Sequence, residues 1–235
     1  MKRTLVLGGL GGIGTAVCDA VRSSSDVVDV VDVREPETPL APQLTVHRVD
    51  LTDDDMRDTW LKQYLADVGS PDGVAWCAGL YPRRDIREYS TVSLRQIIDL
   101  NLVAMLALLP ALVRSALETA RPMRIVVVGS QAGATGGLDV PYAASKAGLV
   151  AAVKSIAREY ARHGVLANVV SPGPVETPMA DVMGDERKRY YESTIPLGRY
   201  SRADEVASVV NWLLTDAPAA INGTVVDVDG GLVRR

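Results

Sequence analysis

Phenylalanine is missing from this sequence, and cysteine and histidine each occur only twice. Cys18 and Cys77 are too few for a disulfide framework, so we expect a reducing compartment, the cytoplasm. Both are expected to be small core residues, the first in a helix and the second in a strand. His47 and His163 have no partners at the spacing of metal ligands, so no metal site is predicted.

An excess of positive charge and long hydrophobic runs are also lacking. The formal net charge is −4 and the pI is near 5.3, whereas a nucleic-acid surface needs clustered positive charge. The longest apolar stretch, residues 102–113, is too short to span a bilayer and contains Pro110. Glycines interrupt the apolar N-terminal run, which argues against a signal peptide. The sequence therefore predicts neither a nucleic-acid partner nor a membrane partner.

The 235 residues are 47% hydrophobic and 23% charged, which suits one globular domain with a substantial core. Runs of valine, isoleucine and leucine alternate with helical patterns, as in βαβ units. The predicted strands cover residues 4–7, 27–33, 45–49, 73–77, 124–128, 166–170 and 224–228. The predicted helices cover residues 13–23, 53–68, 93–119, 142–162, 185–193 and 203–214. We expect an α/β fold: a single doubly wound Rossmann-type domain, residues 1–235, with a mostly seven-stranded parallel sheet and helices on both faces.

The first predicted strand runs directly into the glycine-rich turn GGLGGIG, and a helix follows. In that context glycines let the backbone turn sharply and approach a pyrophosphate at the helix N-terminus. Two registers fit: GxGxxG at Gly9, Gly11 and Gly14, or GxxxGxG at Gly8, Gly12 and Gly14. A plain glycine-rich turn would look the same, so a dinucleotide site needs further support.

Asp32 supplies some of that support. It lies near the end of the second predicted strand, 18 residues past Gly14. A carboxylate there accepts hydrogen bonds from the adenosine ribose and repels a 2′-phosphate, which favours NAD over NADP. Arg34 is the competing observation because it could bind a 2′-phosphate. Asp29 falls inside the strand, too early to reach a ligand, and the sequence gives no reason for it.

Tyr142 and Lys146 stand four residues apart, on one face of a predicted helix. Hydride chemistry at a carbonyl carbon needs a proton donor and acceptor at the oxygen. A free tyrosine has a pKa of about 10, and lowering it to neutrality takes about 4 kcal/mol. One cation about 4 Å away supplies about that much at an effective dielectric near 20. This tyrosine–lysine spacing is common on exposed helices. It indicates an active site only in combination with the other motifs.

Together these motifs resemble the short-chain dehydrogenase/reductase family in its compact single-domain form, over nearly the whole chain. The other matching segments are Asp50-Leu51, Trp76-Cys77-Ala78-Gly79, Asn101, Gly129-Ser130, Pro172 to Thr177 and Asp229-Gly230-Gly231. Three departures stand beside them. Leu7 replaces a frequent threonine, Trp76 and Cys77 replace two asparagines, and the spacing from Ser130 to Tyr142 is one residue shorter than usual. These departures concern the side chains that hold the cofactor turn in place and the shape of the substrate loop. They leave the reacting groups unchanged.

The resemblance implies an NAD-dependent oxidoreductase that interconverts a secondary alcohol and a ketone. Tyr142 would exchange the proton with the substrate oxygen, and Ser130 would orient that oxygen. Lys146 would hold the nicotinamide ribose and lower the tyrosine pKa. Asn101 would support a water that connects Lys146 to solvent. The implied cofactor-binding residues are Gly8, Gly12, Ile13, Gly14, Asp32, Asp50, Leu51, Ala78, Gly79, Tyr142, Lys146, Val175 and Thr177.

The substrate is harder to infer. An apolar pocket is expected from Leu138, Val140, Met179, Val182 and Met183, which favours a compact cyclic or hydroxysteroid-like alcohol. The charged segment around residues 176–195 is expected to be a substrate lid. Arg83 and Arg84 follow the fourth predicted strand, where an arginine could hold a carboxylate or phosphate. A solvated loop or a subunit contact explains that pair more simply.

The resemblance also implies a homo-oligomer, a tetramer or dimer, in which the apolar helices at residues 94–117 and 147–161 meet between subunits. The same apolar faces would suit helices buried in one chain. Two other functions stay open. One is a non-catalytic NAD-sensing or scaffold protein on this fold. The other is a dehydratase or epimerase for nucleotide-sugars, for which 235 residues leave little room.

Overall fold

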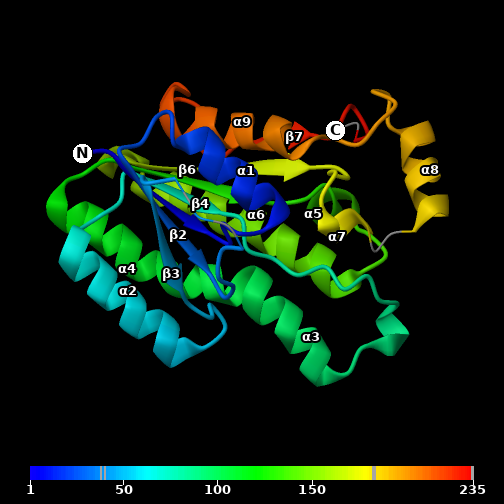
Figure 1. Ribbon diagram of the computed structural model, residues 1–235, viewed down its shortest axis with the longest axis horizontal. Coiled ribbons are helices and arrows are strands. Elements are labelled where there is room, and N and C mark those ends of the chain that lie inside the picture. The colour runs from blue at the N-terminus through cyan, green and yellow to red at the C-terminus, as the bar shows by residue number, and fades with distance from the viewer. Residues whose placement is uncertain (38, 40, 182–183, 234–235) are drawn as a thin grey trace.

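The structure is a computed structural model of the chain and describes residues 1–37, 39, 41–181 and 184–233. One parallel sheet with the strand order β3-β2-β1-β4-β5-β6-β7 forms its centre (Figure 1). The strands are β1 (Arg3–Leu7), β2 (Val27–Asp32), β3 (Leu44–Arg48), β4 (Gly73–Trp76), β5 (Met123–Val128), β6 (Val165–Pro172) and β7 (Val225–Val228). The predicted α/β fold class is confirmed.

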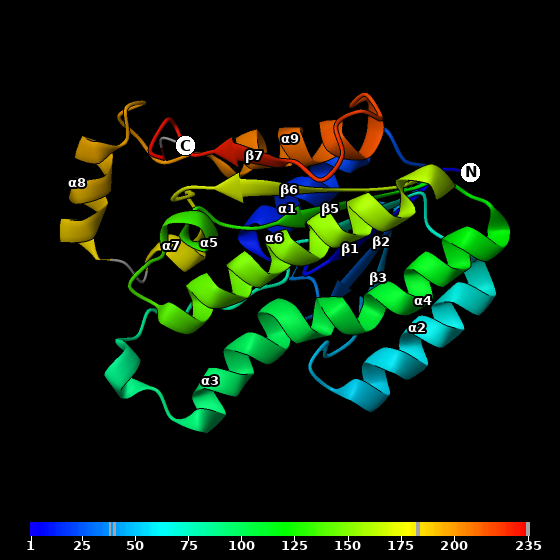
Figure 2. The ribbon, with the colours of Figure 1, turned by 180° about the vertical axis from the view of Figure 1, so that it is seen from behind.

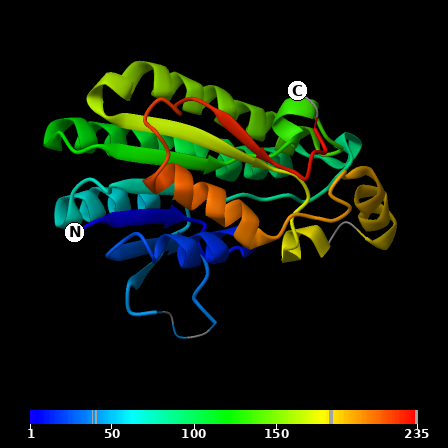
Figure 3. The same ribbon diagram turned by 90° about the horizontal axis from the view of Figure 1, so that it is seen from above.

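Helices cover both faces of the sheet (Figures 2 and 3). They connect successive strands except β2 and β3, between which the described residues form a loop. The helices are α1 (Gly12–Val21), α2 (Asp54–Val68), α3 (Thr91–Ile98), α4 (Ala104–Thr119), α5 (Ala132–Thr135), α6 (Val140–Tyr160), α7 (Pro178–Asp181), α8 (Asp185–Thr194) and α9 (Ala203–Thr215). The shorter helical turns are η1 (Ile86–Glu88), η2 (Asp99–Val103) and η3 (Ala161–His163). The short α5, α7 and η1 were not predicted.

Two hydrophobic cores lie on the two faces of the sheet. Helices α1 and α9 enclose one, and α2, α4 and α6 enclose the other. Strand side chains point to both, so Leu5, Val6 and Leu7 of β1 are all fully buried. Strands of a parallel sheet are buried on both faces, which explains why they appear in the sequence as unbroken apolar runs.

The helix predicted for residues 93–119 is interrupted. A π-helical turn at Asp99–Val103 separates α3 from α4. Such turns often occur at functional sites, and this one holds Asn101, which is fully buried. The whole helical segment Thr91–Thr119 is long and apolar enough to cross a membrane by length and composition. Its inward residues Leu108 and Leu112 lie in the core, as in a core helix of a globular domain.

Asp29 of β2, which the sequence left unexplained, is the centre of a buried polar network. Its Oδ2 accepts hydrogen bonds from Arg3 Nη1 at 2.7 Å and from the Tyr64 hydroxyl at 3.0 Å. Its Oδ1 lies 3.4 Å from His47 Nε2. The network joins β1, β2, β3 and α2 to one another, so we assign it a structural role.

We expect Asp29→Asn to lower the free energy of unfolding by roughly 3 kcal/mol at pH 7, because it removes the counter-charge of a largely buried guanidinium. Burial alone would raise the Asp29 pKa, but hydrogen bonds from His47, Arg3 and Tyr64 outweigh it and hold the pKa below its usual value. The stabilisation is therefore complete above the unfolded-state pKa of about 3.9 and is lost as pH falls through the folded-state pKa.

Urea unfolding across the acid range measures both effects. The wild type should lose stability more steeply there than Asp29→Asn. Glu35→Gln is the control, because Glu35 pairs with Arg48 on the exposed surface and should change stability by less than about 1 kcal/mol. A loss of unfolding free energy in Asp29→Asn as small as that in Glu35→Gln would contradict the structural role of the Asp29 network.

Candidate active site

The turn between β1 and α1 requires glycine where two backbones nearly touch. Gly8 has a φ of +78°, and a Cβ there would lie 2.5 Å from the backbone of Ala78. A Cβ on Gly14 would overlap the carbonyl oxygen of Gly8. At Gly12 a Cβ would lie 2.7 Å from the Thr177 side chain. These three glycines therefore let the turn, β4 and the segment after β6 approach one another.

The alternative glycine register is less demanding. At Gly11 the nearest atom to an added Cβ is 3.4 Å away, an ordinary contact. A Cβ on Gly9 would lie 2.6 Å from the Val30 side chain, as close as the contact at Gly12. The difference between the registers is Gly8, whose positive φ and contact with the Ala78 backbone require glycine, and this favours the spacing Gly8, Gly12 and Gly14. No side chain caps α1 at Gly11, so the positive end of the helix is left for an anion.

Asp32 ends β2 beside this turn. Its Oδ2 accepts a hydrogen bond from the backbone N–H of Leu10 at 3.0 Å. Its two oxygens also accept from Nε and Nη2 of Arg34, at 3.0 and 3.2 Å. Burial acts to raise the Asp32 pKa, but the hydrogen bonds from Arg34 and Leu10 outweigh it and lower the pKa. The carboxylate is therefore charged, and it engages the one nearby guanidinium expected to compete for a 2′-phosphate.

The predicted cofactor residues after β3 and β4 follow the ends of their strands. Leu51 and Ala78 are buried. Asp50 accepts hydrogen bonds from the N–H and hydroxyl of Thr52. A Cβ on Gly79 would lie 3.4 Å from Lys146 Nζ, an ordinary contact, so the turn after β4 lies close to α6.

Helix α6 brings Tyr142 and Lys146 to the cavity wall, and Ser130, two residues after the end of β5, lines the same cavity. The Ser130 hydroxyl acts to lower the pKa of Tyr142. Lys146 is buried, its Nζ lies 5.7 Å from the centre of the Tyr142 ring, and it donates a 2.9 Å hydrogen bond to the carbonyl oxygen of Val128. The three predicted groups thus meet at one point.

Burial works against the predicted lowering of the Tyr142 pKa by Lys146. It raises the pKa of Tyr142 to about 12, and the neighbouring Ser130 hydroxyl offsets only part of that rise. Burial also lowers the pKa of Lys146 to about 8. Desolvation is thus the largest cause of both shifts, and the lowering by Lys146 together with a bound nicotinamide stays a prediction.

Asn101 stands behind the cavity. Its Oδ1 accepts from the N–H of Leu80 at 2.7 Å, and its Nδ2 donates to the carbonyl oxygen of Leu80 at 3.0 Å and to Ser145 Oγ at 3.2 Å. The side chain therefore fixes the chain after β4 against α6. Its predicted role as a support for water stays a prediction.

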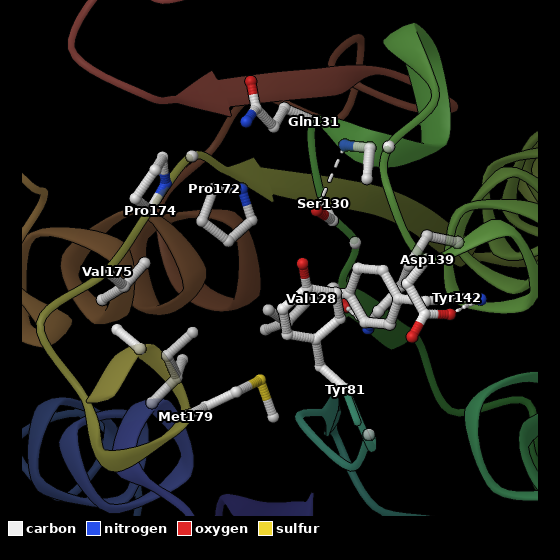
Figure 4. A pocket seen from close by; sticks show the side chains of 18 of the residues that line it. Tyr81, Val128, Ser130, Gln131, Asp139, Tyr142, Pro172, Pro174, Val175 and Met179 are labelled. Atoms are coloured by element: carbon white, nitrogen blue, oxygen red, sulfur yellow. Dashed lines mark hydrogen bonds between the residues drawn. The ribbon is translucent and has the colours of Figure 1, made fainter. Parts of the chain in front are cut away.

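One cavity collects three of the four predicted catalytic residues, all but Asn101, and part of the predicted cofactor set (Figure 4). Of the expected residues it is lined by Ile13, Gly79, Ser130, Leu138, Tyr142, Lys146, Val175, Thr177 and Met179. Val140 is 49% exposed and is not among the described residues that line it. Val182 and Met183 lie outside the described residues.

No site role was predicted from the sequence for several further residues of the cavity wall, among them three with polar or aromatic side chains, of which Tyr191 lies within the expected lid. Tyr81 lies directly after β4, Tyr191 on α8, and Asp139 just before α6. The aromatic residue two positions beyond Gly79 was a usable signal for Tyr81. Cys77, expected in the core, also lines the cavity, and burial raises its pKa well above the usual value. Trp76 is instead fully packed in the core.

The arginine pair after β4 lies on a loop whose backbone is fixed by Asp139. Arg84 is exposed, and its backbone N–H donates to Asp139 Oδ2 at 3.2 Å. Arg83 has a positive φ of 54°, unusual for a residue with a side chain. Neither belongs to the described lining of the cavity, in agreement with the simpler explanation of a solvated loop.

Solved structures support this architecture. The crystal structure of gox2181 superposes with a TM-score of 0.90 at 28% identity, covering 98% of this chain and 95% of that one. A short-chain dehydrogenase/reductase from Brucella melitensis superposes with a TM-score of 0.88, covering 100% of this chain and 97% of that one. At 23% identity the second likeness concerns the fold alone.

Sequence comparisons extend the likeness beyond the fold. The chain is 32% identical to the 3-oxoacyl-acyl-carrier-protein reductase FabG of Haemophilus influenzae, over 98% of both chains. It is 28% identical to an acetoacetyl-CoA reductase of an Acinetobacter strain, over 98% of this chain and 97% of that one. A family model described as enoyl-(acyl carrier protein) reductase matches residues 8–233. The chain therefore belongs to the short-chain dehydrogenase/reductase family of oxidoreductases.

Proposed function

We propose that this protein is an NAD-dependent oxidoreductase that interconverts a secondary alcohol and a ketone, with Tyr142 as the acid/base. One observation carries the proposal. The hydroxyls of Tyr142 and Ser130 and the ammonium of Lys146 meet at a cavity that also reaches Ile13 in the first turn of the uncapped helix α1.

The turn and its surroundings fit a dinucleotide. Gly8 and Gly14 remove side chains where a pyrophosphate would meet the start of α1, and Asp32 presents a charged carboxylate at the ribose position. The proposed binding residues are Gly8, Gly12, Ile13, Gly14, Asp32, Asp50, Leu51, Ala78, Gly79, Tyr142, Lys146, Val175 and Thr177. A bound nicotinamide would give hydride to the ketone or take it from the alcohol.

The side chains would then handle the proton. In ketone reduction the Tyr142 phenol gives its proton to the carbonyl oxygen, and a hydrogen bond from Ser130 orients that oxygen. The high Tyr142 pKa suits this acid role at neutral pH. Lys146 would hold the nicotinamide ribose, and Asn101 would support a water that connects Lys146 to solvent.

For the substrate, the relatives' names favour a 3-oxoacyl thioester. They lend no support to the hydroxysteroid-like alcohol favoured by the sequence, although a compact cyclic ketone would fit the same chemistry. Residues 176–195 are proposed to cover the substrate, since Met179 and Tyr191 line the cavity. We also propose that the protein works in the cytoplasm.

A homo-oligomer is proposed through the outward face of α3 and α4. Exposed apolar side chains occur along it at Val92, Val103, Leu106 and Leu117, which are 39 to 68% exposed. A stable interface needs about 1,200 Å² or more of buried surface, which two paired helices of this length can supply.

The catalytic proposal predicts that Tyr142→Phe loses about 100-fold or more in kcat for ketone reduction, because no acid remains at the carbonyl oxygen. NADH affinity, measured by nicotinamide fluorescence, should stay within about an order of magnitude. Tyr190→Phe is the control, since Tyr190 is 59% exposed on α8 and outside the cavity lining. NADH binding with no turnover of any alcohol or ketone by the wild type would instead favour an NAD-sensing or scaffold role.

The cofactor proposal predicts that the wild type binds NADH more tightly than NADPH. In Asp32→Asn the Kd ratio of NADPH to NADH should fall by about tenfold, the equivalent of 1.4 kcal/mol. The amide still accepts from Leu10 but no longer repels a 2′-phosphate, and Arg34 is released. Glu35→Gln, a nearby exposed change, should leave the ratio unaltered. Tighter NADPH binding by the wild type would overturn the preference for NAD.

The oligomer proposal predicts that Leu106→Arg lowers the mass measured by light scattering after size exclusion, because a buried unpaired charge opposes association. Trp212→Arg, on the opposite face of the sheet in α9, should leave the mass unchanged. A wild-type protein that runs as a monomer would refute the proposal, and loss of assembly only in Trp212→Arg would move the interface to the other face.

A further inference from the structure

The chain after β4 is held at two places by buried polar side chains. Asn101, fully buried, bonds both the N–H and the carbonyl oxygen of Leu80. Asp139, 1% exposed, accepts a 3.2 Å hydrogen bond from the N–H of Arg84. Tyr81 lies between these anchors. Its backbone is therefore fixed on both sides, although it belongs to a connecting loop.

Asp139 also ties this loop to the start of the catalytic helix. Its Oδ1 accepts from the N–H of Tyr142 at 3.1 Å and so caps α6. Its Oδ2 accepts from the Tyr89 hydroxyl at 2.7 Å. One buried carboxylate thus joins both ends of the loop, at Arg84 and Tyr89, to the helix turn that carries the acid/base. Burying it is favourable only because these donors satisfy it.

The ring of Tyr81 lies against the ring of Tyr142 and faces the cavity (Figure 4). The two ring centres are 4.7 Å apart with planes inclined by 58°, within the range of favourable aromatic pairs. The wall next to the reacting oxygen is therefore aromatic and held in place, rather than a mobile side chain on a loop.

The cavity is also unusually rich in tyrosine for this chain. The sequence has no phenylalanine and only eight tyrosines, yet Tyr81, Tyr142 and Tyr191 all line this cavity, together with the thioether of Met179. Aromatic faces and a thioether favour contact with another flat ring. A long, flexible acyl chain would gain little from such a wall.

We propose that Tyr81 is a specificity-determining residue, positioned by Asp139, that selects carbonyl substrates with an aromatic ring on the carbonyl carbon. This inference rests on the proposed function, because it concerns the substrate of the same site. The substrate ring would lie against Tyr81 while the carbonyl oxygen meets Tyr142 and Ser130. Asp139 acts through Tyr81 and is a positioning residue.

Two esters that differ only in this group test the proposal: ethyl benzoylacetate, with phenyl on the carbonyl carbon, and ethyl acetoacetate, with methyl. Both are 3-oxo esters and are reduced with NADH. The wild type should have a KM for the phenyl ester at least about fivefold lower. In Tyr81→Leu the kcat/KM ratio of phenyl to methyl ester should fall about fivefold to tenfold, the worth of an aromatic pair. In Tyr81→Phe it should change by less than about twofold.

Asp139→Asn tests whether Asp139 positions Tyr81. Asparagine also caps helices, but its side chain is a weaker acceptor for the Tyr89 hydroxyl and the Arg84 N–H. The variant should lower the phenyl-to-methyl ratio about threefold through KM when assayed below its melting temperature, which should itself fall because one amide oxygen cannot accept from all three donors. Asp85→Asn is the control: Asp85 lies in the same loop but is exposed, and it pairs with Arg87. A ratio altered equally by both variants would mean that Asp139 only stabilises the loop, and would overturn its positioning role.

The outcomes separate this inference from the function on which it rests. Equal KM values for the two esters in the wild type would overturn the inference alone, even if Tyr81→Leu failed to fold. An unchanged ratio in Tyr81→Leu would do the same. If the wild type binds NADH but reduces neither ester nor any other ketone, the proposed function fails and the inference fails with it.

Discussion

Parallel pairing of every strand is the constraint on which the site depends. Because all the strands run in the same direction, their carboxyl ends all lie at one edge of the sheet. β1 and β4 are neighbours in the sheet. The strands before β4 in sequence are added outward on the β1 side, and the later strands are added on the β4 side. The loops at this switch point therefore leave a crevice at that edge. The turn after β1, the loop with Tyr81 after β4, and Ser130 after β5 therefore meet, although they are far apart in sequence.

Buried polar side chains then fix what the sheet brings together. Asn101 on the π-helical turn and Asp139 at the start of α6 each bond backbone groups of a different element. A buried polar group is tolerated only where its partners are in place, so each of these residues specifies one arrangement. Asp29 does the same on β2, with partners from β1, β3 and α2.

Burial also sets the chemistry of the site. It raises the pKa of Tyr142 to about 12 and lowers that of Lys146 to about 8. The sequence-based expectation rested on the attraction of a phenolate to Lys146, at a separation of about 4 Å, and to an oxidised nicotinamide. In the structure Lys146 donates to the carbonyl of Val128. Burial favours the protonated phenol, the form that can donate a proton.

The sequence by itself determined the fold class, the family, and the convergence of Ser130, Tyr142 and Lys146, because strand and helix periodicities and short motifs are local patterns. From the sequence we could not decide between the two glycine registers, give a role to Asp29, or predict that a π-helical turn at Asp99–Val103 interrupts the helix. We also placed Cys77 in the core and overlooked Tyr81 and Asp139. Those features were decided by tertiary structure, because close backbone approach, desolvation and hydrogen bonds between distant elements depend on which segments meet, and no local pattern encodes that.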